Sequence, residues 1–578
     1  MEKITLTIDG QTVEASPEQT VLEAARAAGI TIPTLCYCPS TKPSGACRVC
    51  LVEVEGMRNL TTSCTLPVQN NMVVQTNSAK VREARRGVVE LLLSDHPNEC
   101  LTCDRSGSCE LQNLTQQLGI RTITYAGSMG DRAVDNSNPS IVRDMRKCVA
   151  CRRCVDVCKE VQEVSALGVA GRGFDSSVCP AFGDELGDVA CALCGQCVLV
   201  CPTGALSEKD STAKVWRALA DPDKHVVVQV APAIRTTIGE EFGLEPGTPL
   251  VGELVEGLRR LGFDKVFDTD FAADLTIIEE GTELLTRLES GGTLPLITSC
   301  SPGWVKYCEH FFPDLLPNLS SCKSPQEMFG AVMKNWYAEK NQIPAEKIFV
   351  VSVMPCTAKK FEVTRPELAT TGEPDVDAVL TTRELAKMFR EAGIDLPKLP
   401  PADFDQPLGE STGAAVIFGT TGGVMEAALR TVYEKVTGET LPQVEFHQVR
   451  GLEGIREATI ELAGTPVRLA LAHGLGNAKK LLQRIQSGEA DYTFVEIMAC
   501  PGGCIGGGGG PRPTNEETRT QRAEALYKLD RDLPLRKSHE NPAIEALYKE
   551  LGEPGGEVAH RLLHTHYHSR RGGCACQE

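Results

Sequence analysis

The chain has 578 residues, 25 cysteines and a formal net charge of −18. A chain this long is expected to fold as several domains, and its acidity argues against nucleic acid as a partner, because phosphate binding needs clustered Lys and Arg. No run approaches the roughly 20 apolar residues of a membrane helix, and the first strand-like segment begins without a signal peptide, so neither a membrane anchor nor secretion is expected. Most of the cysteines stand at spacings that suit metal clusters and need reduced thiols, which predicts a cytoplasmic protein.

Residues 1 to 78 are predicted to form a β-grasp ferredoxin domain. Residues 3 to 7 and 49 to 54 alternate apolar and polar side chains as strands do, and residues 20 to 29 repeat apolar side chains as a helix does. The cysteines of this domain resemble plant-type [2Fe-2S] ligation, with wider first and last gaps. Cys38 competes with Cys36 for the first position, and the spacing favours Cys36. The predicted ligands of one [2Fe-2S] cluster are Cys36, Cys47, Cys50 and Cys64.

Residues 79 to 120 are predicted to form a helix-rich insert with a second kind of cluster. One histidine precedes three cysteines at gaps of three, two and five residues. A neutral imidazole in place of one thiolate leaves a [4Fe-4S] cluster less negative, so its potential should rise. A zinc site would use the same ligands and remains the alternative. The predicted ligands are His96, Cys100, Cys103 and Cys109.

Residues 140 to 210 carry the two-cluster signature of bacterial ferredoxins, after a stretch at 121 to 139 whose Gly, Ser, Asn and Asp content predicts a linker. A Cys-x2-Cys-x2-Cys-x3-Cys run occurs twice, with Pro202 behind the second copy. The last cysteine of each run is expected to cross to the other cluster, because a tight Cys-x2-Cys loop cannot reach every corner of a cubane. Structural zinc is the disfavoured alternative. One predicted [4Fe-4S] cluster takes Cys148, Cys151, Cys154 and Cys201, and the other takes Cys158, Cys191, Cys194 and Cys197.

Residues 224 to 568 change in texture and are predicted to form an α/β domain. Apolar runs at 225 to 230 and 347 to 353 look like buried strands and alternate with helical patterns at 250 to 261 and 381 to 392, which predicts parallel sheets. The whole chain is therefore expected to combine α+β and α/β domains. Residues 569 to 578 are predicted to be a flexible tail. A solvated end is favoured for the last residues of the chain. The alternative is a metal site formed by His560, His564, His566, His568, Cys574 and Cys576.

Three short loops of the C-terminal domain each bring a cysteine beside glycine or proline. They lie at 298–304, 354–360 and 496–504, and each follows a strand-like run. Ligands in open α/β folds gather at the carboxyl ends of strands, and glycines let the backbone approach a bulky inorganic group closely. The loops therefore predict a metal centre assembled from distant segments. Cys179, Cys308 and Cys322 lack ligand spacing and are predicted to be buried thiols.

In these three loops the chain resembles the [FeFe]-hydrogenases, and the resemblance extends from residue 2 to about residue 568. Residues 1 to 210 alone also resemble the iron–sulfur subunit of respiratory complex I. The resemblance implies an enzyme that oxidises H2 and reduces protons reversibly at an H-cluster, a [4Fe-4S] cubane joined through one thiolate to a diiron unit with CO, cyanide and a dithiolate amine. It implies Cys356, Cys500 and Cys504 as cubane ligands, with Cys504 as the shared thiolate. The implied pocket around the diiron unit contains Pro232, Gln326, Met354, Lys359 and Met498, and Lys359 would hold a cyanide.

The first loop departs from the family pattern of two adjacent cysteines, because Cys300 is followed by Ser301. Register places Cys300 where the family has a proton carrier and Ser301 where it has a cubane ligand, yet a thiolate binds iron better than a hydroxyl. Cys300 is therefore a candidate for both roles, cubane ligand and proton carrier. The resemblance also implies a proton path through Glu280, Glu283 and Ser320, whose acidic and hydroxyl groups can pass protons along a hydrogen-bonded chain.

The order of domains resembles the catalytic subunit of multimeric NAD(P)-linked, electron-bifurcating hydrogenases. That resemblance implies a hetero-oligomer with flavin- and NAD(P)-binding and small iron–sulfur partner subunits, and ferredoxin is a further candidate partner. The glycines at 419–423 lack the dinucleotide fingerprint, so any nicotinamide site is expected on another polypeptide. Three alternatives remain open: a monomeric ferredoxin-linked hydrogenase, an electron-transfer subunit with a structural C-terminal domain, and a hydrogen sensor.

Overall fold

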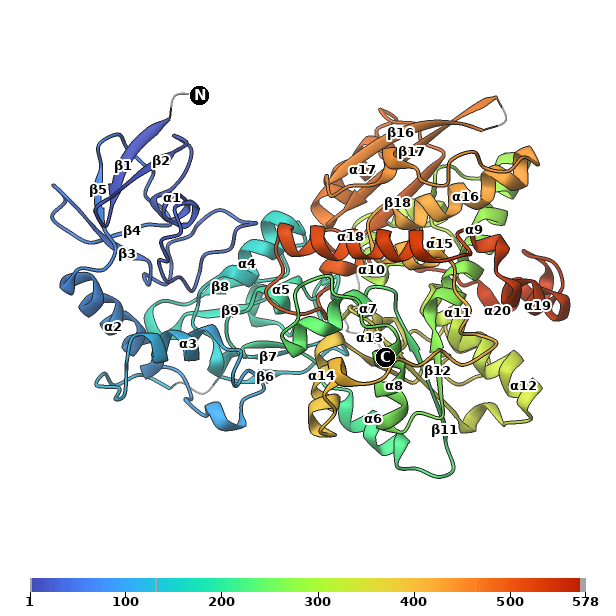
Figure 1. Cartoon of the computed structure of the whole chain (residues 1–578), viewed down its shortest axis with the longest axis horizontal. Coiled ribbons are helices and arrows are strands. Elements are labelled where there is room, and N and C mark those ends of the chain that lie inside the picture. The colour runs from blue at the N-terminus through green and yellow to red at the C-terminus, as the bar shows by residue number, and fades with distance from the viewer. Residues whose placement is uncertain (1–2, 130–131, 463, 572–578) are drawn as a thin grey trace.

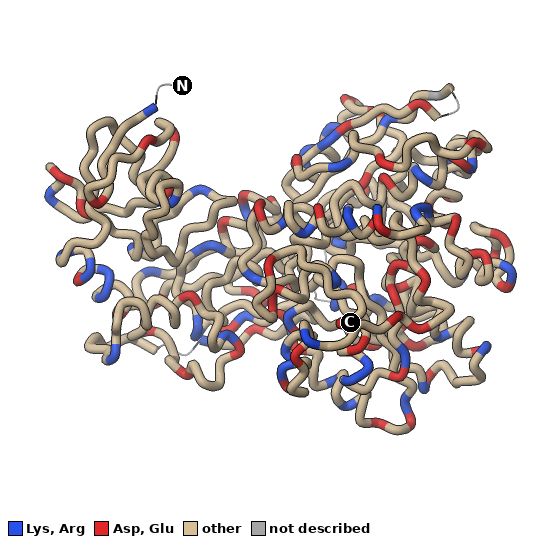
Figure 2. The backbone as a smooth tube through the Cα atoms, in the orientation of Figure 1, with Lys and Arg blue, Asp and Glu red and all other residues tan. Residues whose placement is uncertain are grey.

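The computed structural model describes residues 3–129, 132–462 and 464–571. Figure 1 shows the N-terminal part in blue at one end, helices α4 (Arg153–Asp156) and α5 (Gln196–Val200) in the middle, and the C-terminal part at the other end. Most of the predicted tail, with Cys574 and Cys576, lies outside the described residues. None of the described helices is long and apolar enough to cross a membrane. In Figure 2, Lys and Arg are interspersed with Asp and Glu along the described backbone, so the charge is spread over the molecule.

The N-terminal domain is a mixed sheet with a helix packed on it. The strands lie in the order β2 (Gln11–Ala15), β1 (Ile4–Ile8), β5 (Val73–Gln75), β3 (Leu51–Val54) and β4 (Thr61–Thr62), and β1 pairs with β5 in parallel. Helix α1 (Val21–Ala27) begins at Thr20, whose side chain and that of Glu23 cap each other's backbone N–H groups. Its apolar face joins the core under the sheet. The predicted β-grasp fold is confirmed.

The middle of the chain forms two smaller units. Helices α2 (Ala79–Ser94) and α3 (Glu110–Gln117) flank the loop at 96–109. The next unit pairs β10 (Leu206–Glu208), β7 (Ile141–Asp144) and β6 (Val134–Asp135), and separately β8 (Gly168–Ala170) with β9 (Ser177–Cys179). Helices α4 and α5 each follow a left-handed residue, Arg152 at φ 68° and Gly195 at φ 72°. A Cβ on Gly195 would lie 2.3 Å from the Thr357 hydroxyl oxygen, so only glycine lets this turn approach the C-terminal domain.

Within the described part of residues 224–568, the strands form two four-stranded sheets. The first has the order β12 (Lys265–Asp268), β11 (His225–Val230), β14 (Ile348–Val353) and β15 (Ala378–Leu380), all parallel. The second has the order β13 (Leu296–Ile297), β18 (Phe494–Met498), β17 (Thr465–His473) and β16 (Ile455–Leu462), parallel except for the β16–β17 hairpin. The predicted α/β class with parallel sheets is confirmed. The sequence did not predict the antiparallel β16–β17 hairpin at the edge of the second sheet.

Helices pack on the two sheets, because parallel strands are buried on both faces. The helical patterns at 250–261 and 381–392 correspond to α8 (Gly252–Leu261) and α14 (Thr382–Glu391). Helix α9 (Thr269–Ser290) has 22 residues and contacts both α11 and α16. The other helices are α6 (Thr212–Leu219), α7 (Ile234–Thr237), α10 (Pro302–Phe311), α11 (Pro325–Val332), α12 (Ala338–Asn341), α13 (Lys359–Glu362), α15 (Gly413–Val416), α16 (Gly423–Thr437), α17 (Leu475–Gln486), α18 (Glu516–Asp532), α19 (Pro542–Leu551) and α20 (Glu557–Leu563).

The last described segment packs back across the C-terminal domain. Helix α18 contacts α7 and α15, and α20 contacts α11. A buried ion-pair cluster joins α16 to α18, in which Arg430 pairs with Glu426 at 2.7 Å and with Asp530 at 2.8 Å. Loss of one partner would leave an uncompensated buried charge, so these charges tie the segment to the domain.

Candidate metal centres and active site

Four N-terminal cysteines meet at one buried point of the first domain. The Cys50 and Cys64 sulfur atoms lie 3.3 Å apart, and hydrogen bonds with Cys47 and then Cys64 lower the pKa of Cys36. The Cys38 sulfur lies 3.2 Å from the Ser40 hydroxyl oxygen, and Cys38 is not among the groups whose hydrogen bonds lower the pKa of Cys36. The structure therefore brings together Cys36, Cys47, Cys50 and Cys64 without Cys38.

The histidine and three cysteines of the helix-rich unit line one pocket. The His96 Nδ1 atom is buried and has no hydrogen-bond partner among the described residues. Burial, and then the Lys147 charge, lower the pKa of His96 to about 4, so the imidazole is neutral and can offer a lone pair to a metal. Leu101 is 98% exposed, which places this pocket at the protein surface. The pocket contains His96, Cys100, Cys103 and Cys109 and fits a metal cluster.

The eight ferredoxin cysteines separate into two crossed sets. Burial, and then the nearby Cys201 thiol, raise the pKa of Cys151. Burial also raises the pKa of Cys194 to about 12, and Cys191 and Cys158 are its neighbouring thiols. Buried thiols that crowd each other cannot all ionise without a compensating cation, so each set fits an iron cluster. The sets are Cys148, Cys151, Cys154 and Cys201, and Cys158, Cys191, Cys194 and Cys197.

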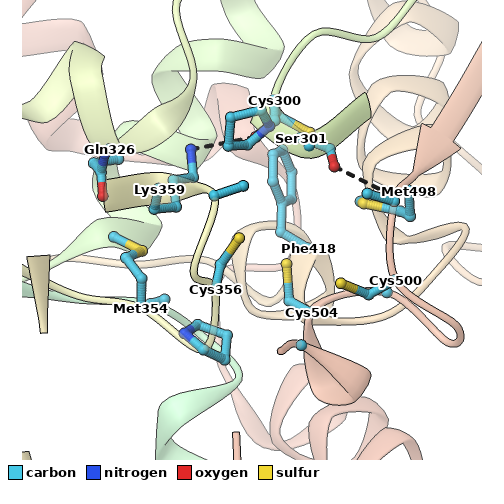
Figure 3. Close-up of a pocket in the computed structure, with 18 of the residues that line it drawn as sticks. Cys300, Ser301, Gln326, Met354, Cys356, Lys359, Phe418, Met498, Cys500 and Cys504 are labelled. Carbon is cyan, nitrogen blue, oxygen red and sulfur yellow. Dashed lines mark hydrogen bonds between the residues drawn. The ribbon is translucent and has the colours of Figure 1, made fainter. Parts of the chain in front are cut away.

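A cavity of about 80 Å³ lies where the three C-terminal loops meet. The loops follow β13, β14 and β18, so carboxyl ends of strands from both sheets face this space. Figure 3 shows the sulfur atoms of Cys356, Cys500 and Cys504 directed into it. The pocket residues that the resemblance implied all line the cavity: Pro232, Gln326, Met354, Lys359 and Met498, together with Cys300, Cys356, Cys500 and Cys504. A set of thiols in an apolar cavity fits an iron centre.

Lys359 is a buried cation on the cavity wall. Its ammonium group donates to Glu362 Oε2 at 2.7 Å, to Ser324 Oγ at 2.7 Å and to the Cys300 carbonyl oxygen at 3.3 Å. Burial by itself lowers the pKa of Lys359, but the Glu362 carboxylate outweighs it, so the net shift is upward and the ammonium stays charged. An anionic cofactor ligand in the cavity would find its counter-charge here.

Cys300 and Ser301 face different neighbours. Cys300 packs against the core that α9 lines, and burial, followed by the Glu280 charge, raises the pKa of its thiol. Ser301 lies against the Cys500 loop, where its Oγ accepts a hydrogen bond from the Ala499 N–H at 3.2 Å (Figure 3). The structure thus places Cys300 near the carboxylates of α9 and Ser301 next to a thiol-bearing loop.

A chain of polar groups leads from Cys300 toward the surface. Glu280 is 2% exposed, and burial, followed by the Glu283 charge, raises its pKa to about 8. The Ser320 hydroxyl donates to Glu283 Oε2 at 2.9 Å, and Glu283 pairs with the partly exposed Arg287 at 2.6 Å. The expected path residues are therefore neighbours in the order Glu280, Ser320, Glu283.

The ferredoxin unit reaches the cavity wall. Cys194 lines the cavity, and its carbonyl oxygen lies 4.0 Å from the Cys500 sulfur. Gln162 is buried between the two units and donates to Cys194 Sγ at 3.4 Å and to the Ala499 carbonyl oxygen at 3.0 Å. A Cβ on Gly508 would lie 2.4 Å from the Cys194 carbonyl oxygen, so the glycine run lets the two units meet this closely. The second ferredoxin cysteine set therefore adjoins the cavity.

Sequence reasoning missed several residues of this site. Glu362, which accepts hydrogen bonds from Lys359 and Gln326, had a local signal because it follows Lys359 by three positions on α13. Gln162 had no such signal, because its partner Ala499 is 337 positions away. The same holds for Phe418, and the sequence predicted Cys194 as a ferredoxin cluster ligand but not its place on the cavity wall.

Family models match most of the chain. The model described as iron only hydrogenase large subunit, C-terminal domain, matches residues 224–508, and the model for the iron hydrogenase small subunit matches residues 516–570. A 2Fe-2S iron-sulfur cluster binding domain matches residues 1–79. The iron-sulfur binding region of NADH-ubiquinone oxidoreductase-G matches residues 85–124, and the ferredoxin-like domain of NADH-quinone oxidoreductase subunit 3 matches residues 138–207.

Several relatives are similar over their full length. The NADP-reducing hydrogenase subunit HndD of Solidesulfovibrio fructosivorans is 53% identical over 99% of this chain and 100% of its own. Iron hydrogenase 1 of Clostridium pasteurianum is 40% identical over 97% of this chain and 99% of its own. The chain is also similar to a solved structure of an [FeFe]-hydrogenase from Chlamydomonas reinhardtii, with 48% identity and a TM-score of 0.57. The match covers 63% of this chain and 100% of the hydrogenase chain in that structure. The similarity thus includes both the cluster-carrying units and the cavity domain.

Proposed function

The chain belongs to the iron-only, or [FeFe], hydrogenase family, and we propose that it oxidises and evolves H2 at the cavity between its two C-terminal sheets. One observation carries this proposal: three thiol-bearing loops, a buried ammonium and a ferredoxin cysteine converge on one cavity. When bound, the H-cluster supplies the chemistry that interconverts H2 with protons and electrons. The chain supplies the ligands, the proton path, the electron path and an apolar enclosure.

Cys356, Cys500 and Cys504 would hold the cubane, with Cys504 as the shared thiolate, and Ser301 would be the fourth ligand. Support for Ser301 comes from its hydroxyl, which lies against the Cys500 loop, whereas Cys300 faces the carboxylates. A serine oxygen can bind iron once its proton has left. The Ala499 N–H that donates to Ser301 Oγ stabilises the negative charge that then stays on that oxygen.

Residues around the remaining cavity would bind the diiron unit. Lys359 supplies a positive charge to anionic cyanide, and the apolar wall strengthens that attraction because it excludes water. Gln326 lines the same wall, and its amide Nε2 donates to Glu327 and Glu362, which leaves its Oε1 atom buried without a partner in the described structure. The rest of the wall is apolar and includes Pro232, Met354, Phe418 and Met498.

Protons would move between the cavity and the surface through side chains of α9 and the loop before α11. Cys300 Sγ accepts or gives up the proton at the inner end. Glu280 follows, and its raised pKa of about 8 lets it exchange protons near neutral pH in either direction. The Ser320 hydroxyl then joins it to Glu283 at the outer end.

Electrons would enter and leave through the ferredoxin cluster of Cys194, because that set adjoins the cavity. Beyond it we propose a second ferredoxin [4Fe-4S] cluster, the His96-ligated [4Fe-4S] cluster and the [2Fe-2S] cluster of the N-terminal domain. The exposed pocket of His96 suits it to exchange electrons with another protein.

We further propose that the chain works as the catalytic subunit of a hetero-oligomer in the cytoplasm, where clustered thiols stay reduced. Its relative HndD is named as a subunit of an NADP-reducing hydrogenase. We infer that its partners are flavin- and NAD(P)-binding subunits and small iron–sulfur subunits, and that the assembly carries out electron bifurcation. Ferredoxin is a further proposed electron partner. Support comes from the name of this relative and from the match of residues 516–570 to the model for the iron hydrogenase small subunit.

The test uses the anaerobically purified full chain after maturation of its H-cluster. H2-driven reduction of a viologen dye is measured together with the infrared bands of CO and cyanide. The proposal expects both rapid dye reduction and the bands. Bands without turnover would instead support a hydrogen sensor or an electron-transfer subunit.

A further inference from the structure

The C-terminal segment brings a histidine to the outer end of the polar chain, where the sequence suggested a solvated end. Residue 564 forms a β-bridge with Cys322, and the Thr565 N–H donates to the Ser321 carbonyl oxygen. These contacts fix the backbone and direct the His564 side chain into the protein, where it is only 5% exposed. In Figure 1 the segment that carries it, with α19 and α20, lies at the outer side of the C-terminal domain beside α11.

His564 lies among the groups that surround Glu283. Its Nε2 atom is 3.0 Å from Glu279 Oε2, and its Nδ1 atom is 2.8 Å from Ser321 Oγ. A ring nitrogen of His564, the Cys322 sulfur and a Glu283 oxygen all lie within 4.8 Å of one another. One water molecule can bridge a gap of that length with a hydrogen bond at each end. His564 is therefore within proton-exchange distance of the last carboxylate of the path.

Glu283 needs a neighbour that can take up and release its proton. Arg287 pairs with it at 2.6 Å, but a guanidinium stays charged and cannot accept another proton. An imidazole titrates near neutral pH and can exchange protons at either ring nitrogen. His564 provides the acid–base function that Arg287 lacks.

Charged groups of opposite sign face His564. Glu279 on α9 lies 3.0 Å from its Nε2 atom, and a Glu283 oxygen lies within 4.8 Å of a ring nitrogen. Arg287 on α9 pairs with Glu283 at 2.6 Å, and Lys435 on α16 lies near Glu279. The charges beside these two carboxylates are therefore mixed in sign.

The remaining neighbours of His564 are uncharged or lead outward. Burial raises the pKa of both Cys322 and Tyr548, so neither is ionised near neutral pH. The His560 ring stacks on His564 with centroids 4.4 Å apart, and His560 is exposed to solvent. A titratable route thus continues from Glu283 through His564 to the surface.

We propose that His564 is a proton-transfer residue that exchanges protons between Glu283 and solvent, an inference that rests on the proposed hydrogenase function. In H2 oxidation the Glu283 O–H bond breaks, a bridging water passes one proton to the imidazole, and the imidazolium releases one proton to solvent next to His560. Proton reduction runs the same steps in reverse, and no electron moves in either direction. The segment at 516–570 then takes part in catalysis as well as in packing.

The experiment compares His564→Ala with His566→Ala in the matured full chain. His566 is exposed on the same segment and is the matched control. We expect His564→Ala to lower kcat by about 10²-fold at pH 7 in dilute buffer, the low end of the range for a lost acid–base group, with unchanged KM for H2 and unchanged infrared bands. Added imidazole should restore most of the lost rate, which a purely structural defect would not allow. His566→Ala should match the parent.

Three further outcomes decide the inference. An unchanged kcat and pH profile in His564→Ala would overturn it, and so would a loss of rate that imidazole does not restore while the infrared bands persist. If His564→Ala does not fold, Ser321→Ala decides, because it removes only the Nδ1 partner: a lower, pH-shifted kcat supports the inference, and a parental profile overturns it. Absence of turnover in the parent chain would instead refute the hydrogenase function itself.

Discussion

The accessory cluster sites and the catalytic cavity hold iron in opposite ways. In the ferredoxin unit, three proposed ligands of one cluster lie within seven consecutive residues, from Cys148 to Cys154. The proposed ligands of the cavity instead come from loops at 298–304, 354–360 and 496–504, which only the two sheets bring together. A local site is specified by its own loop, whereas a site built from distant loops depends on the whole domain.

The two regions also differ in the charges around them. Thiols crowd the ferredoxin sets, where burial and then the neighbouring thiols raise the pKa of Cys154 and of Cys197. The cavity adds a buried cation, Lys359, and a buried acid, Glu280, whose pKa is about 8. Electron transfer needs only the clusters, whereas hydrogen chemistry also needs a counter-charge and a proton path. The comparison therefore predicts which substitutions should abolish or lower H2 turnover while the accessory clusters stay intact.

The largest expected effect separates the two regions completely. Cys500→Ala should abolish H2-driven dye reduction and the CO and cyanide infrared bands, because one cubane ligand is lost. The electron paramagnetic resonance signals of the accessory clusters should remain. Cys308→Ala is the matched control, since Cys308 is a fully buried thiol outside the cavity and its loss should cost about 1 kcal/mol of stability with little effect on turnover. Retained bands in Cys500→Ala would contradict the assigned ligand set.

The next effect distinguishes the two adjacent residues of the first loop. Cys300→Ala should lower turnover by roughly 10³-fold and keep the infrared bands, because it removes a proton carrier. Ser301→Ala should lose the bands, and Ser301→Cys should keep them at shifted frequencies. The opposite pattern, with bands lost in Cys300→Ala and kept in Ser301→Ala, would assign the ligand role to Cys300.

A smaller effect on turnover, with a pH signature, is expected at Glu280. Glu280→Gln should lower kcat by about 10²-fold, and Glu289→Gln, exposed on the same helix, should not. The pKa of Glu280 rises from 4.5 to about 8 on folding, so the folded state holds the proton more tightly and the wild type loses stability as pH rises across that range. Glu280→Gln should therefore raise the free energy of unfolding at pH 8 by on the order of 3 kcal/mol and change it little at pH 4.5. Equal melting temperatures for the wild type and Glu280→Gln at pH 8 would show that folding does not raise the pKa of Glu280.

The smallest effect is expected at the junction between the two regions. Gln162→Leu removes the N–H that donates to Cys194 Sγ, so the reduced cluster loses stabilisation and its midpoint potential should fall by tens of millivolts. Redox titration of the reduced cluster signal measures the change, with the His96-ligated cluster as an internal reference. A potential that does not move would mean that this hydrogen bond does not tune the cluster.

The sequence by itself determined the parts whose information is local. Cysteine spacing predicted the accessory ligand sets, since a short loop fixes where its own side chains can reach, and apolar periodicity predicted β11, β14, α8 and α14. The family resemblance named the three cavity loops and the pocket residues that line the cavity. It also named both candidate roles of Cys300 but could not choose between them.

Only the tertiary structure decided what depends on contacts between distant segments. It placed Ser301 against the Cys500 loop and Cys300 near Glu280, put Cys194 on the cavity wall, and buried His564 beside Glu279. The β-bridge between residues 322 and 564 joins positions that no short-range pattern relates. Burial and neighbouring charge set the chemistry of these groups, and both arise only when the sheets and the C-terminal segment pack together.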